Sequence, residues 1–284
     1  MDTLSSSRLI ALLWPYGAAD YSGVAQQHVF WGMNVALNAS GYHGVFLDGG
    51  RCSGLGMQNA ERECELLSYV LNNRFGGVVF CSQAHSSNRN LIQEVAQTIP
   101  LVLLDRLIPG VRADFVGFQN RDSIMEATSH LINRGHRRIA LVTSGECTNI
   151  EQERLDGYRL ALNEAFPEDA YEMILSTPLT HARAWPMLDA IARLPAEERP
   201  TAIICVNKAD AVRVADYLCA KNIRVPEEVS LAGFDNAGRI LVDGFSLTTG
   251  GRPFEEIGSA AAKLILRRSQ DPSAKHEHIK LPVN

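Results

Sequence analysis

Polar side chains follow nearly every predicted strand of this 284-residue sequence, at the point where the strand ends. Asp, Asn and Arg are prominent among them, and these residue types hold a small polar molecule through several hydrogen bonds. A single polar residue at a strand end more often marks the place where the chain reaches solvent. The repetition at so many strands favours a binding site. The residues are Asp48, Ser82, Gln83, Asp105, Arg106, Ser144, Asn207, Lys208, Asp235 and Asn236.

No catalytic set can be assembled from the residue types and their spacing. The sequence has no G-x-S-x-G elbow, no phosphate-binding loop and no H-E-x-x-H motif. The pair His276-x-His278 is better explained as part of a solvated tail than as a metal site. The cysteines show no C-x-x-C spacing, so we expect reduced thiols and no zinc site. We therefore predict a binding protein that is not an enzyme and uses no metal or cofactor.

The segment 199–236 shows how such polar groups are positioned. Residues 201–206 and 229–234 are short apolar runs typical of strands buried on both faces. Between them, apolar residues recur with helical spacing, namely Ala211, Val214, Ala215 and Leu218. Strand, helix and strand form one right-handed βαβ unit. In such sheets ligands bind just beyond the carboxyl ends of the strands, which is where Asn207 and Asp235 stand.

The same alternation runs through the whole chain and predicts an α/β fold. Two successive halves share it, so we expect two doubly wound parallel-sheet lobes joined by crossing segments. The N-terminal lobe would comprise residues 5–116 plus 250–270, and the C-terminal lobe residues 117–249 plus 271–284. A cleft would open between the carboxyl edges of the two lobes.

Composition narrows the class of protein further. The sequence is 46% hydrophobic and 21% charged, as in ordinary globular domains. No apolar run approaches the ~20 residues that a membrane helix needs, and no signal peptide is visible. The net charge of −5 argues against a broad nucleic-acid surface on this chain. We expect a cytoplasmic protein without a membrane partner.

Four motifs resemble those of the LacI/GalR family of bacterial transcription regulators. They are RGHRRIALV, ERLDGYRLAL, PTAIICVNKADAV and VPEEVSLAGFDN, in the family's order and spacing. The similarity extends from residue 8 to about residue 282. It implies the effector-binding core of such a regulator, with the type I periplasmic-binding-protein fold. It also implies a homodimer and a small-molecule effector, most often a sugar or sugar derivative.

The resemblance assigns roles to residues that match the family's motifs. Its R-x-x-G-aromatic arginine, which reaches ligand hydroxyls or a carboxylate, corresponds to Arg154. Asn207 and Asp235 match an Asn and an Asp that follow strands, and Asp105 and Phe254 match positions that often line the pocket. We add Ser82 as a strand-end hydroxyl and Tyr16 as an apolar face for a ring. The expected ligand-binding residues are thus Arg154, Asn207, Asp235, Asp105, Phe254, Tyr16 and Ser82.

The sequence also departs from the family. A helix-turn-helix head and a hinge helix precede the family's first strand, whereas seven residues do so here. We therefore expect operator binding only through a DNA-binding head that this chain lacks. Residues 119–123, QNRDS, replace the usual D-N-x-x-G. A periplasmic solute-binding protein has the same fold and is the alternative, opposed by the missing signal peptide and the unpaired cysteines.

Overall fold

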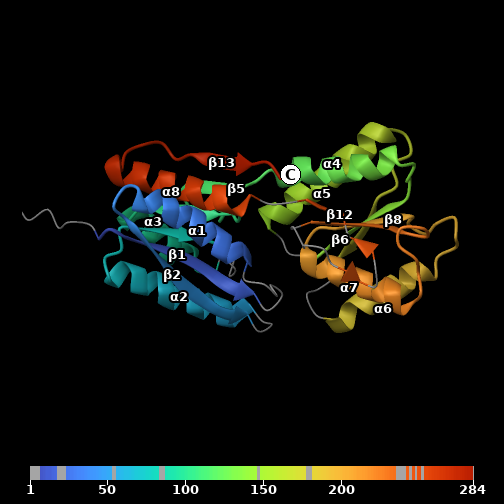
Figure 1. The fold of residues 1–284 in the computed structure, drawn as a ribbon, viewed down its shortest axis with the longest axis horizontal. Coiled ribbons are helices and arrows are strands. Elements are labelled where there is room, and N and C mark those ends of the chain that lie inside the picture. Colours follow the sequence, from blue (N-terminus) through green and yellow to red (C-terminus); the bar gives the residue numbers. More distant parts are fainter. Residues whose placement is uncertain are drawn as a thin grey trace, which may run out of the picture. The chain divides into compact units, whose positions relative to one another are not determined.

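The structure is a computed structural model that describes residues 7–17, 24–52, 56–82, 87–145, 148–176, 181–234, 241–242, 245–246, 248–250 and 253–283. The chain divides into two compact units (Figure 1). Unit 1 comprises Met1–Phe118 and Pro253–Leu281, and unit 2 comprises Gln119–Arg252 and Pro282–Asn284. Each unit is built around its own parallel sheet.

Unit 1 contains a six-stranded sheet in the order β13-β5-β4-β3-β1-β2, and every neighbouring pair is parallel. Its central strands β3 and β4 are buried at every position, as in parallel sheets covered by helices on both faces. The six strands are β1 (Leu9–Gly17), β2 (His43–Cys52), β3 (Gly77–Phe80), β4 (Leu101–Leu104), β5 (Asp114–Phe118) and β13 (His278–Leu281).

The helices of unit 1 are α1 (Val24–Asn38), α2 (Gly56–Asn72), α3 (Arg89–Thr98) and α8 (Phe254–Gln270). Helices α2 and α3 pack on one face of the sheet, where their apolar residues form a cluster with alternate residues of the strands. Helix α8 contacts β3, β4 and β5 and lies along α1 (Figure 1). The backbones of α1 and α8 touch at glycines: a Cβ on Gly32 would lie 2.0 Å from the Glu255 carbonyl oxygen, and a Cβ on Gly258 2.0 Å from that of Val29.

Unit 2 contains a five-stranded parallel sheet in the order β12-β9-β8-β6-β7 and a separate antiparallel pair, β10 (Leu241–Val242) and β11 (Phe245–Ser246). The strands of the sheet are β6 (Ile139–Thr143), β7 (Met173–Ser176), β8 (Ala202–Cys205), β9 (Ser230–Phe234) and β12 (Thr248–Gly250). The helices are α4 (Asn120–Asn133), α5 (Asn149–Ala165), α6 (His181–Ala192) and α7 (Lys208–Ala220).

Two apolar layers sandwich the sheet of unit 2. Helices α6 and α7 contribute to one cluster, with alternate residues of β6, β7 and β8. Helices α4 and α5 contribute to the other, which the remaining alternate residues of the same strands complete. Both sheets are therefore doubly wound, as the alternation in the sequence predicted, and the α/β fold class is confirmed.

The final strand corrects two expectations. Residues 271–281 lie in unit 1, although the sequence assigned them to the C-terminal lobe. The reason is β13, which pairs in parallel with β5, for example through Ile279 and Val116. The solvated tail expected around His276 and His278 is therefore a sheet edge, with the His278 ring 5.5 Å from that of Phe115. The other boundaries differ by two or three residues, since 117–118 lie in unit 1 and 250–252 in unit 2.

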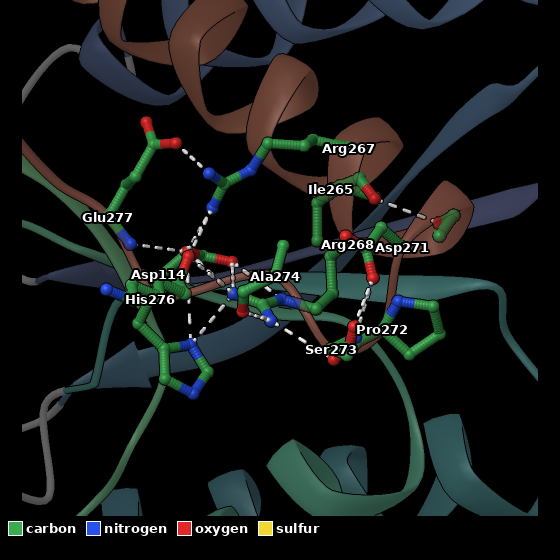
Figure 2. A network of polar contacts seen from close by, with 12 residues as sticks. Asp114, Ile265, Arg267, Arg268, Asp271, Pro272, Ser273, Ala274, His276 and Glu277 are labelled. Carbon is green, nitrogen blue, oxygen red and sulfur yellow. Dashed lines mark hydrogen bonds and ion pairs between the residues drawn. The ribbon is translucent and has the colours of Figure 1, made fainter.

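A buried carboxylate holds the segment before β13 in place (Figure 2). Asp114, the first residue of β5, is fully buried and accepts hydrogen bonds from both Arg267 and Arg268 of α8, at 3.0–3.1 Å. The backbone N–H of Glu277 donates to the same carboxylate at 2.8 Å, and its side chain pairs with Arg267. A buried carboxylate needs such partners, and these connect β5, α8 and the loop before β13.

Candidate functional site

The carboxyl ends of the parallel strands define one edge of each sheet, and the predicted ligand-binding residues lie near these edges. In unit 1, Ser82 follows β3 and Asp105 follows β4. In unit 2, Asn207 follows β8 by two residues, and Arg154 lies on α5, the helix after β6. Asp235 lies outside the described residues, and of Tyr16 the structure describes the backbone in β1 but not the side chain.

In unit 1 the hydroxyl group of Ser82 donates to a buried carboxylate. Its Oγ lies 3.2 Å and 3.4 Å from the two carboxylate oxygens of Glu63, a residue of α2. Ser82 is 1% exposed and Glu63 is 2% exposed, so their contact is sealed from solvent. The Ser82 hydroxyl is the donor in this contact, so its proton is committed to Glu63. The sequence indicated Ser82 but gave no sign of Glu63, which stands within an ordinary helical pattern.

Asp105 and Phe254 also belong to unit 1. Asp105 has a φ of +60°, in the left-handed region that few non-glycine residues adopt, and its backbone N–H donates to the Val116 carbonyl at 2.8 Å. Phe254 begins α8, and its ring meets that of Phe118 edge to face, with centroids 5.9 Å apart. The half-buried Phe254 thus has an aromatic partner within its own unit.

In unit 2, Arg154 is a buried link between three elements. It is 4% exposed, and its Nε and Nη2 donate to Oδ1 of Asn120 at 3.1 Å and 3.0 Å. Its Nη1 donates to the carbonyl oxygen of Val206 at 2.5 Å. The guanidinium therefore joins α5 to the start of α4 and to the end of β8. Asn120, in the segment that departs from the family pattern, is a partner that the sequence did not reveal.

Asn207 caps the helix that follows it. Its Oδ1 accepts from the Asp210 backbone N–H at 2.8 Å, and its Nδ2 donates to the Asp210 carboxylate at 2.6 Å. Asn is a favoured N-cap residue because it satisfies an N–H group that lacks an intrahelical partner. Asp210, in the first turn, is 2% exposed and pairs with Arg213 at 3.1 Å. The spacing Asn-x-x-Asp after a strand was the available signal for this arrangement.

A third cluster stands at the end of β6. One carboxylate oxygen of Glu151, in the first turn of α5, accepts from the Thr143 hydroxyl at 2.8 Å and from the Ser144 backbone N–H at 2.9 Å. The Ser144 hydroxyl donates to the same oxygen. Thr148 is the N-cap, and its hydroxyl accepts from the Glu151 N–H at 3.2 Å. The Thr-x-x-Glu spacing resembles a capping box, but the Glu151 side chain reaches back to β6.

The motif that suggested a ligand contact is also a packing motif. A Cβ on Gly157 would lie 2.1 Å from the Arg121 carbonyl oxygen, so this glycine lets α5 touch α4. Tyr158 is fully buried, and its hydroxyl donates to the Ile139 carbonyl at 2.7 Å and accepts from the Met173 N–H at 3.0 Å. Burial raises the pKa of Tyr158 to about 12. Arg154, Gly157 and Tyr158 together tie α5 to α4, β6, β7 and β8.

At both edges carboxylates accept hydrogen bonds from neighbouring hydroxyl or amide groups. The hydroxyl protons of Ser82, Thr143 and Ser144 and one amide proton of Asn207 are donated to the carboxylates of Glu63, Glu151 and Asp210, so the three hydroxyl groups retain only oxygen lone pairs. Within the described residues no group of three or more His, Cys, Asp or Glu side chains could hold a metal ion. The helices of the described chain include none long and apolar enough to cross a membrane.

Comparison with known proteins identifies the class of domain. The family model described as "periplasmic binding protein-like domain" matches residues 128–284, more than half of the chain. The HTH-type transcriptional repressor PurR of Vibrio atlanticus is 32% identical over 214 residues, covering 74% of this chain and 63% of the repressor. The chain thus spans less than two thirds of the length of the curated relatives it matches.

Solved structures share the fold over nearly the whole chain. A regulatory protein of the LacI family from Chloroflexus aggregans matches with a TM-score of 0.81 and 21% identity, covering 98% of this chain and 96% of that protein. A LacI family transcriptional regulator from Enterococcus faecium with bound ribose has a TM-score of 0.76 and 22% identity, covering 97% and 96% of the two chains. The chain belongs to the periplasmic binding protein-like domain family, and its fold is similar to that of LacI-family regulators.

Proposed function

We propose that this chain senses a small polar effector, such as a sugar or sugar derivative, for a LacI-type transcription regulator. The residues that we expect to bind the effector are Arg154, Asn207, Asp235, Asp105, Ser82, Tyr16 and Phe254. Binding would control the affinity of a DNA-binding head for its operator, in the cytoplasm. The regulator would act as a homodimer.

One observation carries this proposal, namely that the PurR relative is a transcriptional repressor that matches three quarters of the chain. The ribose bound to the Enterococcus faecium regulator supports a sugar-like effector. The hydroxyl groups of Thr143 and Ser144 donate to Glu151 and can accept hydrogen bonds from such a ligand. Sugar hydroxyls are donors that would meet the lone pairs of Thr143 and Ser144, which are partly exposed.

Thermal unfolding with a panel of small molecules tests the proposal. D-ribose, other neutral sugars, polyols, sugar phosphates and nucleobases would each be added to the purified chain. A ligand present at 100 times its Kd should add about 2.7 kcal/mol to the free energy of unfolding. A saturable shift with one chemical class, confirmed by calorimetric titration, supports the effector role. A panel in which every compound leaves the unfolding temperature unchanged contradicts it.

Asp235 supplies the test of the site itself. In a water-poor site, removal of a charged hydrogen-bond partner leaves the ligand's donor unpaired, so we expect Asp235→Ala to weaken effector binding roughly 30-fold or more. Asp169→Ala is the matched control, because Asp169 has the same charge and an exposed side chain with a single long contact to Arg137. Equal affinities for the two variants would show that Asp235 does not contact the effector.

A further inference from the structure

A pocket lies in unit 1, at the opposite edge of the sheet from Ser82 and Asp105. It has a volume of about 240 Å³ and is formed by the end of α3, the start of β4, the residues before β5 and the last turns of α8. Pro272 and His276, in the loop after α8, close one side. Because it lies at the amino ends of the strands, this pocket is separate from the proposed effector site.

The charged side chains that line the pocket are all basic. Arg112, Arg268 and His276 contribute to its wall, and no described Asp or Glu does so. Arg268 is neutralised by Asp114 behind the wall, with two hydrogen bonds of 3.0–3.1 Å from its Nη2. Arg112 differs from it: within the described residues its guanidinium makes no hydrogen bond or ion pair. The pocket therefore holds one uncompensated positive charge.

The network around Asp114 also determines which ring nitrogen of His276 carries the proton. Arg268 donates from Nη2 to Nδ1 of His276 at 3.0 Å, so Nδ1 is an acceptor and the ring proton is on Nε2. Figure 2 shows this second ring nitrogen turned away from the network. Burial, and next the charge of Arg268, lower the pKa of His276, so the ring is neutral at pH 7. Nε2–H is then a donor that the described residues leave without a partner.

Two carbonyl groups near the C-terminal end of α3 already accept hydrogen bonds. The C-terminal end of α3 brings carbonyl groups to the pocket, and a helix C-terminus disfavours negative charge. However, the Glu94 carbonyl accepts from the Thr98 hydroxyl at 2.8 Å, and the Val95 carbonyl accepts from the Ile99 N–H at 2.9 Å. The rest of the wall is partly apolar, with Ile99, Pro100 and Leu101 on one side.

We propose that this pocket binds the carboxylate group of a small organic acid. The Arg112 guanidinium would donate two parallel hydrogen bonds to the carboxylate from its planar N–H groups. The Nε2–H group of His276 would donate a further hydrogen bond. The hydrocarbon part of the acid would lie against Ile99, Pro100 and Leu101. This pocket would bind an anion through hydrogen-bond donors. The carboxyl edges would instead offer acceptors to the hydroxyl groups of the effector.

Calorimetric titration of the purified chain with sodium benzoate, at constant ionic strength set with sodium chloride, tests this site. We expect saturable one-to-one binding, which Arg112→Ala weakens about tenfold through loss of the charge-assisted pair. His276→Asn keeps an oxygen acceptor for Arg268 in place of Nδ1 but removes Nε2–H, and it should weaken binding several-fold. Thermal unfolding checks that both variants remain folded.

The matched control is Arg134→Ala, which removes the same charge from an exposed position in unit 2 and should leave benzoate binding unchanged. Inorganic phosphate and acetate are the comparison ligands, and both should bind more weakly than benzoate because phosphate has no apolar part and acetate has only a methyl group. Three results would overturn the proposal. These are absence of saturable benzoate binding, equal weakening by Arg134→Ala, and tighter binding of phosphate than of benzoate.

Discussion

The buried guanidinium group of Arg154 leads us to predict a structural role, whereas its motif suggests a role in ligand binding. From the sequence we expected Arg154 to contact the ligand. Its Nε, Nη1 and Nη2 instead donate to Asn120 and to the Val206 carbonyl. Arg154→Ala removes these donors from buried oxygens, so we expect it to lower the free energy of unfolding by about 2–4 kcal/mol, measured in urea.

Arg159→Ala is the control on the same helix. Arg159 pairs with Glu172 at 3.0 Å, and both side chains are more than a third exposed. Such a surface pair contributes little, so the variant should lose less than about 1 kcal/mol. If the two variants were equally stable, Arg154 would not be the structural link that its contacts indicate. A loss of effector binding at unchanged stability would assign it to the ligand instead.

The raised pKa of Tyr158 determines how this residue affects the free energy of unfolding at alkaline pH. Burial raises its pKa from the ordinary 10.0 to about 12, so the folded chain favours the neutral phenol. The corresponding stability is fully present below pH 10 and is lost as the pH rises through about 12. Unfolding free energies measured from pH 9 to 12 should therefore fall by about 2–3 kcal/mol on account of this residue.

Tyr158→Phe should flatten that pH dependence and also cost about 1–3 kcal/mol at pH 7, because the Ile139 carbonyl and the Met173 N–H lose their partner. Tyr217 needs separate treatment, since burial and its hydrogen bond to Asp189 raise its pKa to about 12 as well. Tyr217→Phe is therefore measured in parallel. An unchanged alkaline slope in Tyr158→Phe would contradict the assignment.

At the scale of elements, contact between helix backbones sets the geometry of unit 1. Gly258→Ala places a Cβ 2.0 Å from the Val29 carbonyl oxygen and 2.8 Å from the Met33 nitrogen, both of which are backbone atoms of α1. The helices must separate to accept it. We expect the variant to lose about 1–3 kcal/mol of unfolding free energy, although alanine has the higher helix propensity.

Lys263→Ala, at an exposed position of α8, controls for the change in helix propensity. It should stay within about 0.5 kcal/mol of the parent chain in the same denaturant titration. Gly32→Ala probes the contact from the other helix, where the Glu255 carbonyl would be 2.0 Å from the new Cβ. If both glycine variants were as stable as Lys263→Ala, the close approach of α1 and α8 would not limit the packing.

At the scale of the whole molecule, we expect the chain to form a homodimer that does not bind operator DNA on its own. The expectation rests on its LacI-type relatives and on its net charge of −5. Light scattering at micromolar concentration measures the mass directly, and an electrophoretic shift assay with duplex DNA at low salt measures the affinity. A stable monomer contradicts the first half of the prediction, and tight, salt-dependent DNA binding contradicts the second.

Much of the fold was predictable because its signals are local. Apolar runs such as 201–206, the helical spacing from Ala211 to Leu218, and glycine or proline stops fix where elements begin and end. Strand β13 was missed because an edge strand with alternating exposed residues has little apolar pattern, and its pairing with β5 joins segments about 160 residues apart. Long-range pairing of this kind leaves no trace in a short window of sequence.

The sequence by itself determined the βαβ order, the polar strand ends and, through the spacing of its motifs, the family. Only the tertiary structure decided the hydrogen-bond partners of those polar residues. Arg154 meets Asn120, Ser82 meets Glu63, and Asp114 meets Arg268 because buried polar groups must find partners across the fold. Which partner each group finds depends on packing between distant elements. The type of a residue and its spacing from its neighbours in the sequence do not show which distant elements will pack against it.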